Sequence, residues 1–462
     1  MRFKIRGMLL RSAVIAALGG FLFGFDTAVI SGAEGTLSVI FNQNYTSFSL
    51  IFGTVNFWHG FTVASALIGT IIGALVFGKP ADMFGRRKML FMLGALYFIS
   101  AIGSALAFNW IFFVIMRFIG GLAVGGSSVV APMYNAEISP AKFRGRMVAL
   151  TQFNIVFGIM FAYFTNFIIN SLNLGDIAWR WMFGVEAIPA LAFFLLLFLN
   201  PRSPRWLISR NLIDEARQVI RDLGSDRDNV EQEIIEIKES LHADRDSLRE
   251  RFFQPKYSKP IFLAITIAAF NQLSGINAVL YYAPRVFEMA GFAQSSAMLS
   301  SVVIGFVMLV FTLLAMLIID HFGRKKLMLY GSIGYIVSLF AIAITFFTNG
   351  ENFTDLGGYV VLISLMVFIA AHGFGQGAVI WVFISEIFPN KVRARGQALG
   401  SFTHWFMAAA ISWSFPIFAA ISGGFIFTFY AFCMVLQLLW VLFIMPETKG
   451  IPLEELQKKW GL

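Results

Sequence analysis

Long apolar runs alternate with short polar segments along almost the whole chain. The runs are about 20 residues long, the length at which an α-helix crosses the hydrocarbon core of a bilayer, and they lack the short alternating segments of an outer-membrane barrel. Twelve spans are predicted, with boundaries near 12–34, 55–78, 89–108, 110–133, 147–170, 181–199, 259–284, 296–319, 327–348, 357–384, 397–420 and 424–445. The pattern therefore predicts an all-α integral membrane protein with twelve transmembrane helices.

Composition and the N-terminal segment agree with this prediction. Hydrophobic residues make up 58% of the chain and charged residues 13%, whereas soluble domains carry about 25% charged residues. The basic start MRFKIRGMLLR resembles a signal peptide, but the run after it has no persuasive cleavage site and continues through Asp26 to Ile30. A retained first helix is therefore expected. The single cysteine, Cys433, has no partner for a disulfide within the chain.

The basic residues divide sharply between the two sides of this helix map. An even number of spans puts both termini on one side, and 32 of the 35 Lys and Arg residues lie there, twelve of them in the segment 200–259. The others are Arg180 and Arg285 on the opposite side and Arg117 inside the fourth span. The asymmetry places both termini in the cytoplasm. It also accounts for the net charge of +9 without nucleic-acid binding.

Three short motifs recur at an offset of 238 to 249 residues: GKPADMFGRRK with IDHFGRKK, EISPAKFR with EIFPNKVR, and PRSPR with PETKG. Each pair follows the second, fourth or sixth helix of its half, which indicates duplication. The predicted domains are a six-helix half (1–199), a cytoplasmic linker with short helices (200–258), a second six-helix half (259–446) and a cytoplasmic tail (447–462). Substrate sites in such folds lie between the halves near the midplane.

The repeated motifs contain acidic and basic residues that are candidates for a conformational latch. Glu137 with Arg144, and Glu386 with Arg393, are spaced to bridge neighbouring helix ends. The alternative is ordinary surface salt bridges, worth about 0–1 kcal/mol each, but recurrence in both halves favours a latch. The latch candidates are Asp82, Arg86, Arg87, Glu137, Arg144, Asp320, Arg324, Glu386 and Arg393.

Asp26 and Arg117 are the two clearest charges in the middle of predicted spans, and Glu186 lies embedded nearer the start of its helix. Ionisable residues at this depth are costly and mark functional sites. A pair that forms in one conformation and separates in another changes its proton affinity as the protein moves, which coupling requires. The alternative is a static ion pair that braces the first and fourth helices.

The stretches FLFGFDTAVISG, RFIGGLAVGG, NQLSGINAVLYYAP, SEIFPNKVR and PETKG together resemble the sugar porter family of the major facilitator superfamily, over about residues 12–450. The similarity is greatest to bacterial proton-coupled pentose and hexose symporters. It implies the fold of that superfamily, with two pseudo-symmetric halves that rock about a central sugar site. It also implies that the latches stabilise an outward-open state and that Asp26 is the proton site.

The resemblance also implies a sugar site made of amides, which donate and accept hydrogen bonds, and of aromatic rings. Carried over position by position, it comprises Phe23, Gln152, Asn271, Gln272, Asn277, Tyr281, Trp381, His404 and Trp405. Ile159, Met308 and Ala378 depart from the family pattern, as do Asn271 and His404. His404 either substitutes for a family Gln or relays a proton. Outside the resemblance, such amides and tryptophans also serve as interhelical contacts and interface anchors.

The predicted function is import of a monosaccharide or similar polyol by proton symport through alternating access. An uncoupled sugar or inositol uniporter and a non-transporting sugar sensor remain alternatives. The linker shows no nucleotide-binding loop, metal-ligand cluster or nucleophile motif, so no enzyme, cofactor or metal site is predicted. The expected partners are a sugar, a proton and membrane lipid, without nucleic acid, and the protein is expected to act as a monomer in the inner or plasma membrane.

Overall fold

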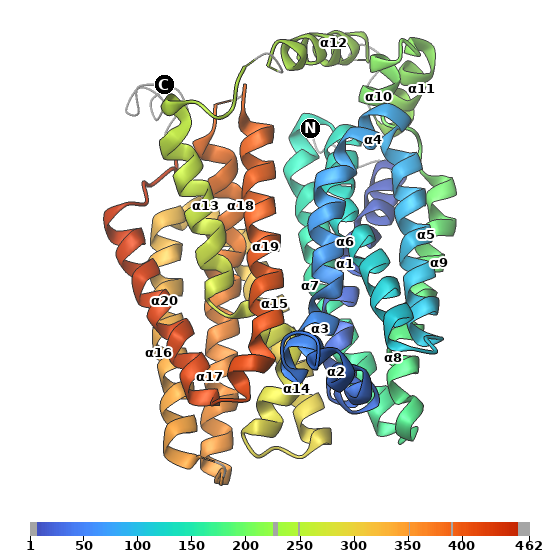
Figure 1. Ribbon diagram of the computed structural model, residues 1–462. Coiled ribbons are helices and arrows are strands. Elements are labelled where there is room, and N and C mark those ends of the chain that lie inside the picture. The colour runs from blue at the N-terminus through green and yellow to red at the C-terminus, as the bar shows by residue number, and fades with distance from the viewer. Residues whose placement is uncertain (1–6, 225–229, 248–249, 351, 390, 451–462) are drawn as a thin grey trace.

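Two bundles of membrane-length helices stand side by side in the computed structural model (Figure 1). The structure describes residues 7–224, 230–247, 250–350, 352–389 and 391–450. The side chains of residues 141–146, 148, 242–247 and 320 lie outside the described part. Within the described ranges every regular element is a helix, as expected in lipid, where a helix pairs its own backbone groups.

The N-terminal bundle contains the first six predicted spans. Asn109 caps its fourth span by accepting a hydrogen bond from Phe112 N, and Thr54 caps the second in the same way, because the first N–H groups of a helix lack partners within it. The elements are α1 (Gly7–Ile40), α2 (Asn42–Ser49), α3 (Val55–Val76), α4 (Gly78–Phe84), α5 (Arg86–Ala105), α6 (Trp110–Ile138), α7 (Ala141–Ser171), η1 (Gly175–Ile177), α8 (Ala178–Val185), α9 (Ala187–Leu196) and η2 (Leu197–Leu199).

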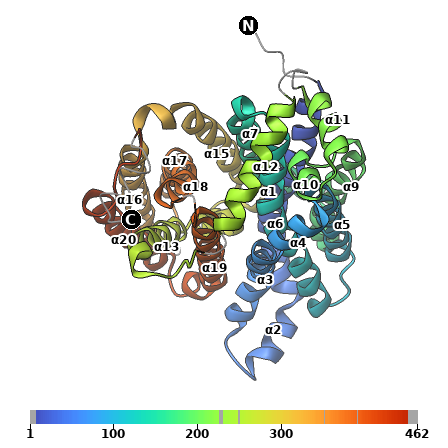
Figure 2. The ribbon, with the colours of Figure 1, turned by 90° about the horizontal axis from the view of Figure 1, so that it is seen from above.

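The C-terminal bundle contains the last six predicted spans, and three linker helices precede it. The bundle is formed by η3 (Pro255–Tyr257), α13 (Ser258–Leu273), α14 (Ile276–Met289), α15 (Gln294–Phe322), α16 (Arg324–Asn349), α17 (Asp355–Phe374), α18 (Gln376–Ile387), α19 (Arg393–Ala419) and α20 (Gly423–Phe443). The linker forms α10 (Pro204–Ser209), α11 (Ile213–Leu223) and α12 (Val230–Ser247). These three helices lie at one end of the molecule, here called the linker face, and α12 runs from α11 towards the C-terminal bundle (Figures 1 and 2).

Among the described residues, eleven segments are long and apolar enough to cross a membrane. The predicted span 397–420 is not one of them, although α19 occupies that place and packs against α3 and α13. Two polar side chains of α19 bond to groups outside this helix: Arg395 donates to the carbonyl of Glu250, and His404 contacts Gln272 of α13. A helix that buries polar residues between its neighbours has a lower mean hydropathy than one surrounded by lipid.

Three predicted spans are broken into two helices each. Gly275 separates α13 from α14 with a φ of +87°, a conformation that glycine adopts without steric cost. Gly375 separates α17 from α18, and Glu186 lies between α8 and α9. Within α14 the helix also kinks at Tyr282, two residues before Pro284, since proline disrupts the preceding turn.

Glycines bring α3 and α6 into backbone contact. A Cβ atom on Gly121 would overlap the carbonyl oxygen of Ala66, and one on Gly69 would overlap that of Phe118. Small residues are what allow transmembrane helices to approach this closely. The motif RFIGGLAVGG therefore joins two neighbouring helices of the N-terminal bundle into a tight seam.

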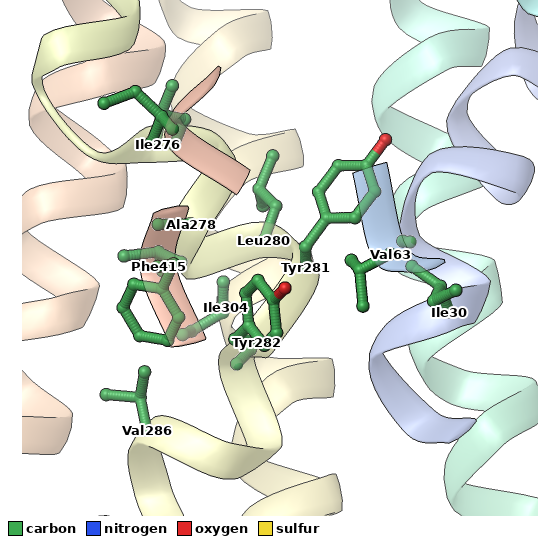
Figure 3. Close-up of a cluster of buried hydrophobic side chains, with 14 of the residues drawn as sticks. Ile30, Val63, Ile276, Ala278, Leu280, Tyr281, Tyr282, Val286, Ile304 and Phe415 are labelled. Carbon is green, nitrogen blue, oxygen red and sulfur yellow. The ribbon is translucent and has the colours of Figure 1, made fainter. Parts of the chain in front are cut away.

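The two bundles meet at the end farther from the linker face, and their ribbons diverge towards it (Figure 1). The contacts between them pair α3 with α19, α7 with α15, and α1 with α14. Trp413 Nε1 donates to Phe57 O at 3.0 Å, and Tyr163 Oη donates to Leu280 O at 2.7 Å. Figure 3 shows Tyr281 pointing from α14 towards Ile30 and Val63 of the other bundle.

Candidate functional site

Asp26 and Arg117 form a buried ion pair between α1 and α6. Arg117 Nη1 donates to Asp26 Oδ1 at 2.5 Å, and Nη2 donates to the backbone oxygen of the same residue at 3.1 Å. Both side chains are at most 2% exposed. The guanidinium also lies over the ring of Phe183, 5.2 Å from its centroid. The contact proposed from the sequence therefore exists in this conformation.

Glu186 is a third buried ionisable group beside this pair. Its side chain interacts electrostatically with both Asp26 and Arg117. Its Oε1 atom has no hydrogen-bond partner among the described residues, and a buried carboxyl oxygen without a partner is costly. The three residues come from α1, α6 and the α8–α9 junction, so one guanidinium interacts with two carboxyl groups.

Small residues allow the helices that carry this cluster to approach one another. A Cβ on Gly120 would overlap Ser100 Oγ and lie 3.3 Å from Asp26 Oδ1. A Cβ on Gly24, two residues before Asp26, would overlap the backbone of α7 at Ile155. Glycine at these positions holds α1 between α6 and α7 and keeps Asp26 within reach of Arg117.

The helix break at Gly275 gathers three predicted sugar-site amides. Asn277 Nδ2 donates to Gln272 Oε1 at 2.8 Å, and Gln272 Nε2 donates to Asn271 Oδ1 at 2.9 Å. All three side chains are less than 10% exposed. A continuous helix would turn residues 272 and 277 to different faces, so the glycine turn is what brings these amides together.

Aromatic residues extend this amide cluster towards the other bundle. The His404 ring nitrogens lie 3.3 Å from Gln272 Nε2, and its ring centroid is 5.1 Å from that of Trp381. Trp405 continues the series and contacts Phe23 of α1, with ring centroids 5.5 Å apart. Residues from five helices therefore form one polar and aromatic surface that reaches across the boundary between the bundles.

Gln152 and Tyr281 are less directly joined to this surface. Gln152 is half-buried on α7, and among the described residues it makes no hydrogen bond to the amide cluster. Tyr281 is buried on α14, one turn beyond Asn277. The positions where the sequence departs from the family pattern, Ile159 and Met308, are buried and apolar, so they offer a sugar no hydrogen bond.

The first latch motif forms an ion-pair network at the linker face. Arg86 contacts Asp82 at 2.7 Å and Glu137 at 2.9 Å, and Glu137 accepts a hydrogen bond from Ser203 at 2.5 Å. Arg87 instead donates to the carbonyls of Leu197 and Phe198. The predicted partner of Glu137, Arg144, has a side chain outside the described part.

The second latch motif repeats this arrangement in the C-terminal bundle. Arg324 contacts Glu386 through two donors, at 2.7 and 3.1 Å. Glu386 also accepts from Thr448 Oγ1 at 2.6 Å. The expected pairing of Glu386 with Arg393 is not what the structure shows: Arg324 of α16 reaches Glu386 at the end of α18, and Arg393 Nε has no partner among the described residues. Asp320 lies outside the described side chains.

Replacing Arg324 by Gln is expected to destabilise the protein. Arg324 is 9% exposed in its side chain, and removing one member of a largely buried pair costs about 3 kcal/mol. Thermal unfolding in detergent should therefore shift to a lower temperature. Lys326→Gln, an exposed change in the same motif, serves as the control, and equal melting temperatures for the two variants would contradict the prediction.

Sequence reasoning missed a second charged cluster, at the face opposite the linker. Glu34 of α1 accepts hydrogen bonds from His59 of α3 at 2.6 Å and from Arg285 of α14 at 2.7 Å. Glu34 is 2% exposed. A carboxylate and a histidine within apolar runs were the available signal, but both lie near the ends of their runs, where charges are common.

Comparison with known proteins places the whole chain in a family. The family model described as "Sugar (and other) transporter" matches residues 12–460. The D-xylose-proton symporter of Escherichia coli K12 is 38% identical, with 97% of this chain and 94% of that protein covered. The arabinose-proton symporter of Bacillus subtilis is 34% identical, with 98% of this chain and 95% of that protein covered. The inward open structure of the xylose transporter XylE from E. coli superposes with a TM-score of 0.85 at 36% identity. The match covers 98% of this chain and 100% of that one.

The fold is that of a multi-pass membrane transporter. The chain belongs to the sugar transporter family of the major facilitator superfamily. The predicted fold class and the family are therefore confirmed, as is the prediction of a transporter rather than an enzyme.

Proposed function

We propose that this protein imports a monosaccharide by proton symport through alternating access. The observation that carries the proposal is the composition of α1. This helix holds the buried carboxylate Asp26, paired with Arg117, and one turn earlier it holds Phe23, which contacts Trp405 of the aromatic surface. A helix that contacts both candidate ligand sites can make the binding of one ligand depend on the other. The proton-symporter relatives support the same function.

The amide and aromatic surface is the proposed sugar site. Gln272 and Asn277 present donors and acceptors for hydroxyl groups, and Trp381 offers a ring face for the apolar C–H side of a sugar. The surrounding helices supply the other proposed contacts: Phe23, Gln152, Asn271, Tyr281, His404 and Trp405. A site built to hydrogen-bond hydroxyl groups discriminates strongly against ligands that lack them, which favours a monosaccharide or similar polyol.

We infer that the linker face is cytoplasmic and that the structure is open towards it. The linker and both latch motifs carry most of the basic residues, as the positive-inside rule requires. The bundles contact one another near the opposite face, through Trp413 and Tyr163 among others. The good superposition on an inward open structure of a relative supports the same assignment. We further propose that the protein acts as a monomer in the plasma or inner membrane.

Coupling follows from the way the buried pair responds to a proton. An ionised Asp26 is held by Arg117, whereas a protonated Asp26 has lost the charge that attracts the guanidinium. Protonation therefore weakens the attraction between α1 and α6 and changes the relative stability of the two conformations, which is the differential binding that symport needs. Glu186 also interacts electrostatically with Arg117, so it can balance the charge of the guanidinium when Asp26 is neutral.

A proteoliposome uptake screen tests this function. Pentoses, hexoses and inositols are supplied with and without an inward proton gradient, while external pH is recorded. Symport predicts that at least one sugar accumulates only with the gradient and that its addition makes the external medium more alkaline. Uptake that never exceeds equilibration would point to a uniporter, and binding without uptake would point to a sensor.

Gln272→Ala is expected to weaken sugar binding about ten-fold or more, because losing hydrogen bonds in a buried site costs about 1–3 kcal/mol. Gln272 bonds Asn271, Asn277 and His404, so its loss also leaves those groups without a partner. Equilibrium binding of the sugar identified in the screen measures the effect. Gln232→Ala, on the exposed side of the linker, is the control. Unchanged affinity in Gln272→Ala would remove this residue from the site.

A further inference from the structure

The charged cluster at the face opposite the linker joins the two bundles. Glu34 and His59 belong to the N-terminal bundle, and Arg285 belongs to the C-terminal bundle. Glu34 Oε1 lies 2.7 Å from Arg285 Nη1 and 2.6 Å from His59 Nε2. The side chains of Glu34 and His59 are 3% exposed and that of Arg285 is 28% exposed. This is a largely buried ion pair across the boundary at which the bundles meet.

The helices that carry the pair are also those that carry the proposed ligand sites. Glu34 lies eight residues after Asp26 on α1, about 12 Å along the helix. Arg285 lies one turn beyond Tyr281 and two turns beyond Asn277 on α14. The pair therefore connects the proposed proton helix to the proposed sugar helix at their shared end.

The pair can exist only while this face is closed. Arg285 reaches Glu34 because α14 packs against α1, and rocking the bundles apart at this end would separate them. A polar cavity of about 340 Å³ lies beside the pair, lined among others by Asn42, Asn56 and Glu288. Opening would extend this cavity between the bundles and expose a carboxylate that is now buried and neutralised. The contact thus contributes free energy to one conformation alone.

We propose that Glu34 and Arg285, with His59 holding the carboxylate in place, form a latch that closes the face opposite the linker and stabilises the conformation described. The proposal rests on the alternating-access function proposed above. This outer latch differs from the linker-face latches, since Arg86–Glu137 and Arg324–Glu386 each lie within one bundle. It makes Glu34 and Arg285 positioning residues that act on the relative placement of the bundles.

Spin-label distances across this face test the outer latch. In a Cys433→Ser background, which removes the single native cysteine, labels are attached at Gln43→Cys on α2 and Ser295→Cys on α15, both exposed. Loss of the latch by Glu34→Gln or by Arg285→Gln should each raise the ratio of the long-distance to the short-distance population about ten-fold, within the usual range of conformational coupling. The double variant should show no further increase, because both changes break one contact.

Arg180→Gln is the matched control, since Arg180 is the other basic residue of this face and contacts Ala105 and Trp179 within its own bundle. It should leave the distances unchanged. The charge-retaining variants Glu34→Asp and Arg285→Lys should restore most of the short-distance population, which a general folding defect would not allow. Unchanged distributions in both Gln variants, or additive effects in the double variant, would overturn the proposal. The measurement needs no sugar, so its failure is distinguishable from a failure of the uptake screen.

Discussion

Asp26→Asn is expected to abolish sugar accumulation driven by a proton gradient while sugar exchange across the membrane survives. The amide cannot take up a proton, so the gradient can no longer bias the conformational equilibrium. Arg117 keeps its hydrogen bond to the backbone oxygen of residue 26, and the side-chain oxygen remains an acceptor, so the helices should stay packed. The ratio of internal to external sugar should fall to about one, the value for uncoupled equilibration.

Two measurements in the same proteoliposomes separate this outcome from simple loss of function. Uptake under a proton gradient reports coupling, and exchange of labelled sugar for unlabelled sugar at equal pH reports movement of the loaded carrier. Glu236→Gln removes an exposed carboxylate from the linker and should retain both activities. Persistent gradient-driven accumulation in Asp26→Asn would show that the proton binds elsewhere, with Glu186 as the next residue to replace.

Gly60→Val is expected to reduce net transport more than ten-fold by preventing closure of the face opposite the linker. A Cβ at this position would overlap the backbone oxygen of Trp413 in the other bundle, so α3 and α19 could not approach as they do here. Blocking one of the two alternating states stops turnover, because a carrier must pass through both. The labelled pair at positions 43 and 295 should then show only the long distance.

Gly35→Val provides the comparison for this change. Gly35 also lies towards the face opposite the linker, but a Cβ there meets no atom within 4 Å, so transport should continue at close to the parent rate. Sugar added from the outside should still bind to Gly60→Val, since the blocked step is closure and not binding. A Gly60→Val protein that transports normally would show that this close approach is not needed in the cycle.

The positions of the membrane helices could be predicted from the sequence, whereas the breaks within them could not. Apolar runs of membrane length predicted where the helices lie, and charge asymmetry supported their number. The breaks at Glu186, Gly275 and Gly375 were not predicted as helix ends. A break within an apolar run leaves the pattern of hydrophobic residues unchanged. Both half-helices are buried by neighbouring helices, so the residues on either side of the break stay apolar.

In the candidate site, too, contacts could be predicted where the local sequence pattern left few possible partners, and not where they depend on which helices pack together. Asp26 and Arg117 could be paired from the sequence because few charges lie mid-membrane, so each had few candidate partners. At the linker face many charges compete, and the seven-residue spacing suggested Arg393 for Glu386, whereas Arg324 from another helix is the partner found. Glu34 and Arg285 lie 251 residues apart in different halves, and only the packing of α14 against α1 connects them.

The glycine seam between α3 and α6 has a mechanical consequence. Where Gly69 and Gly121 bring backbones into contact, neither residue has a side chain whose rotamers could rearrange, and a close-packed interior transmits strain. The N-terminal bundle should therefore behave as a stiff lever, in which a small displacement near Asp26 becomes a larger one at the helix ends. Hydrogen exchange during turnover should accordingly be slow along this seam and faster around the turn at Gly275.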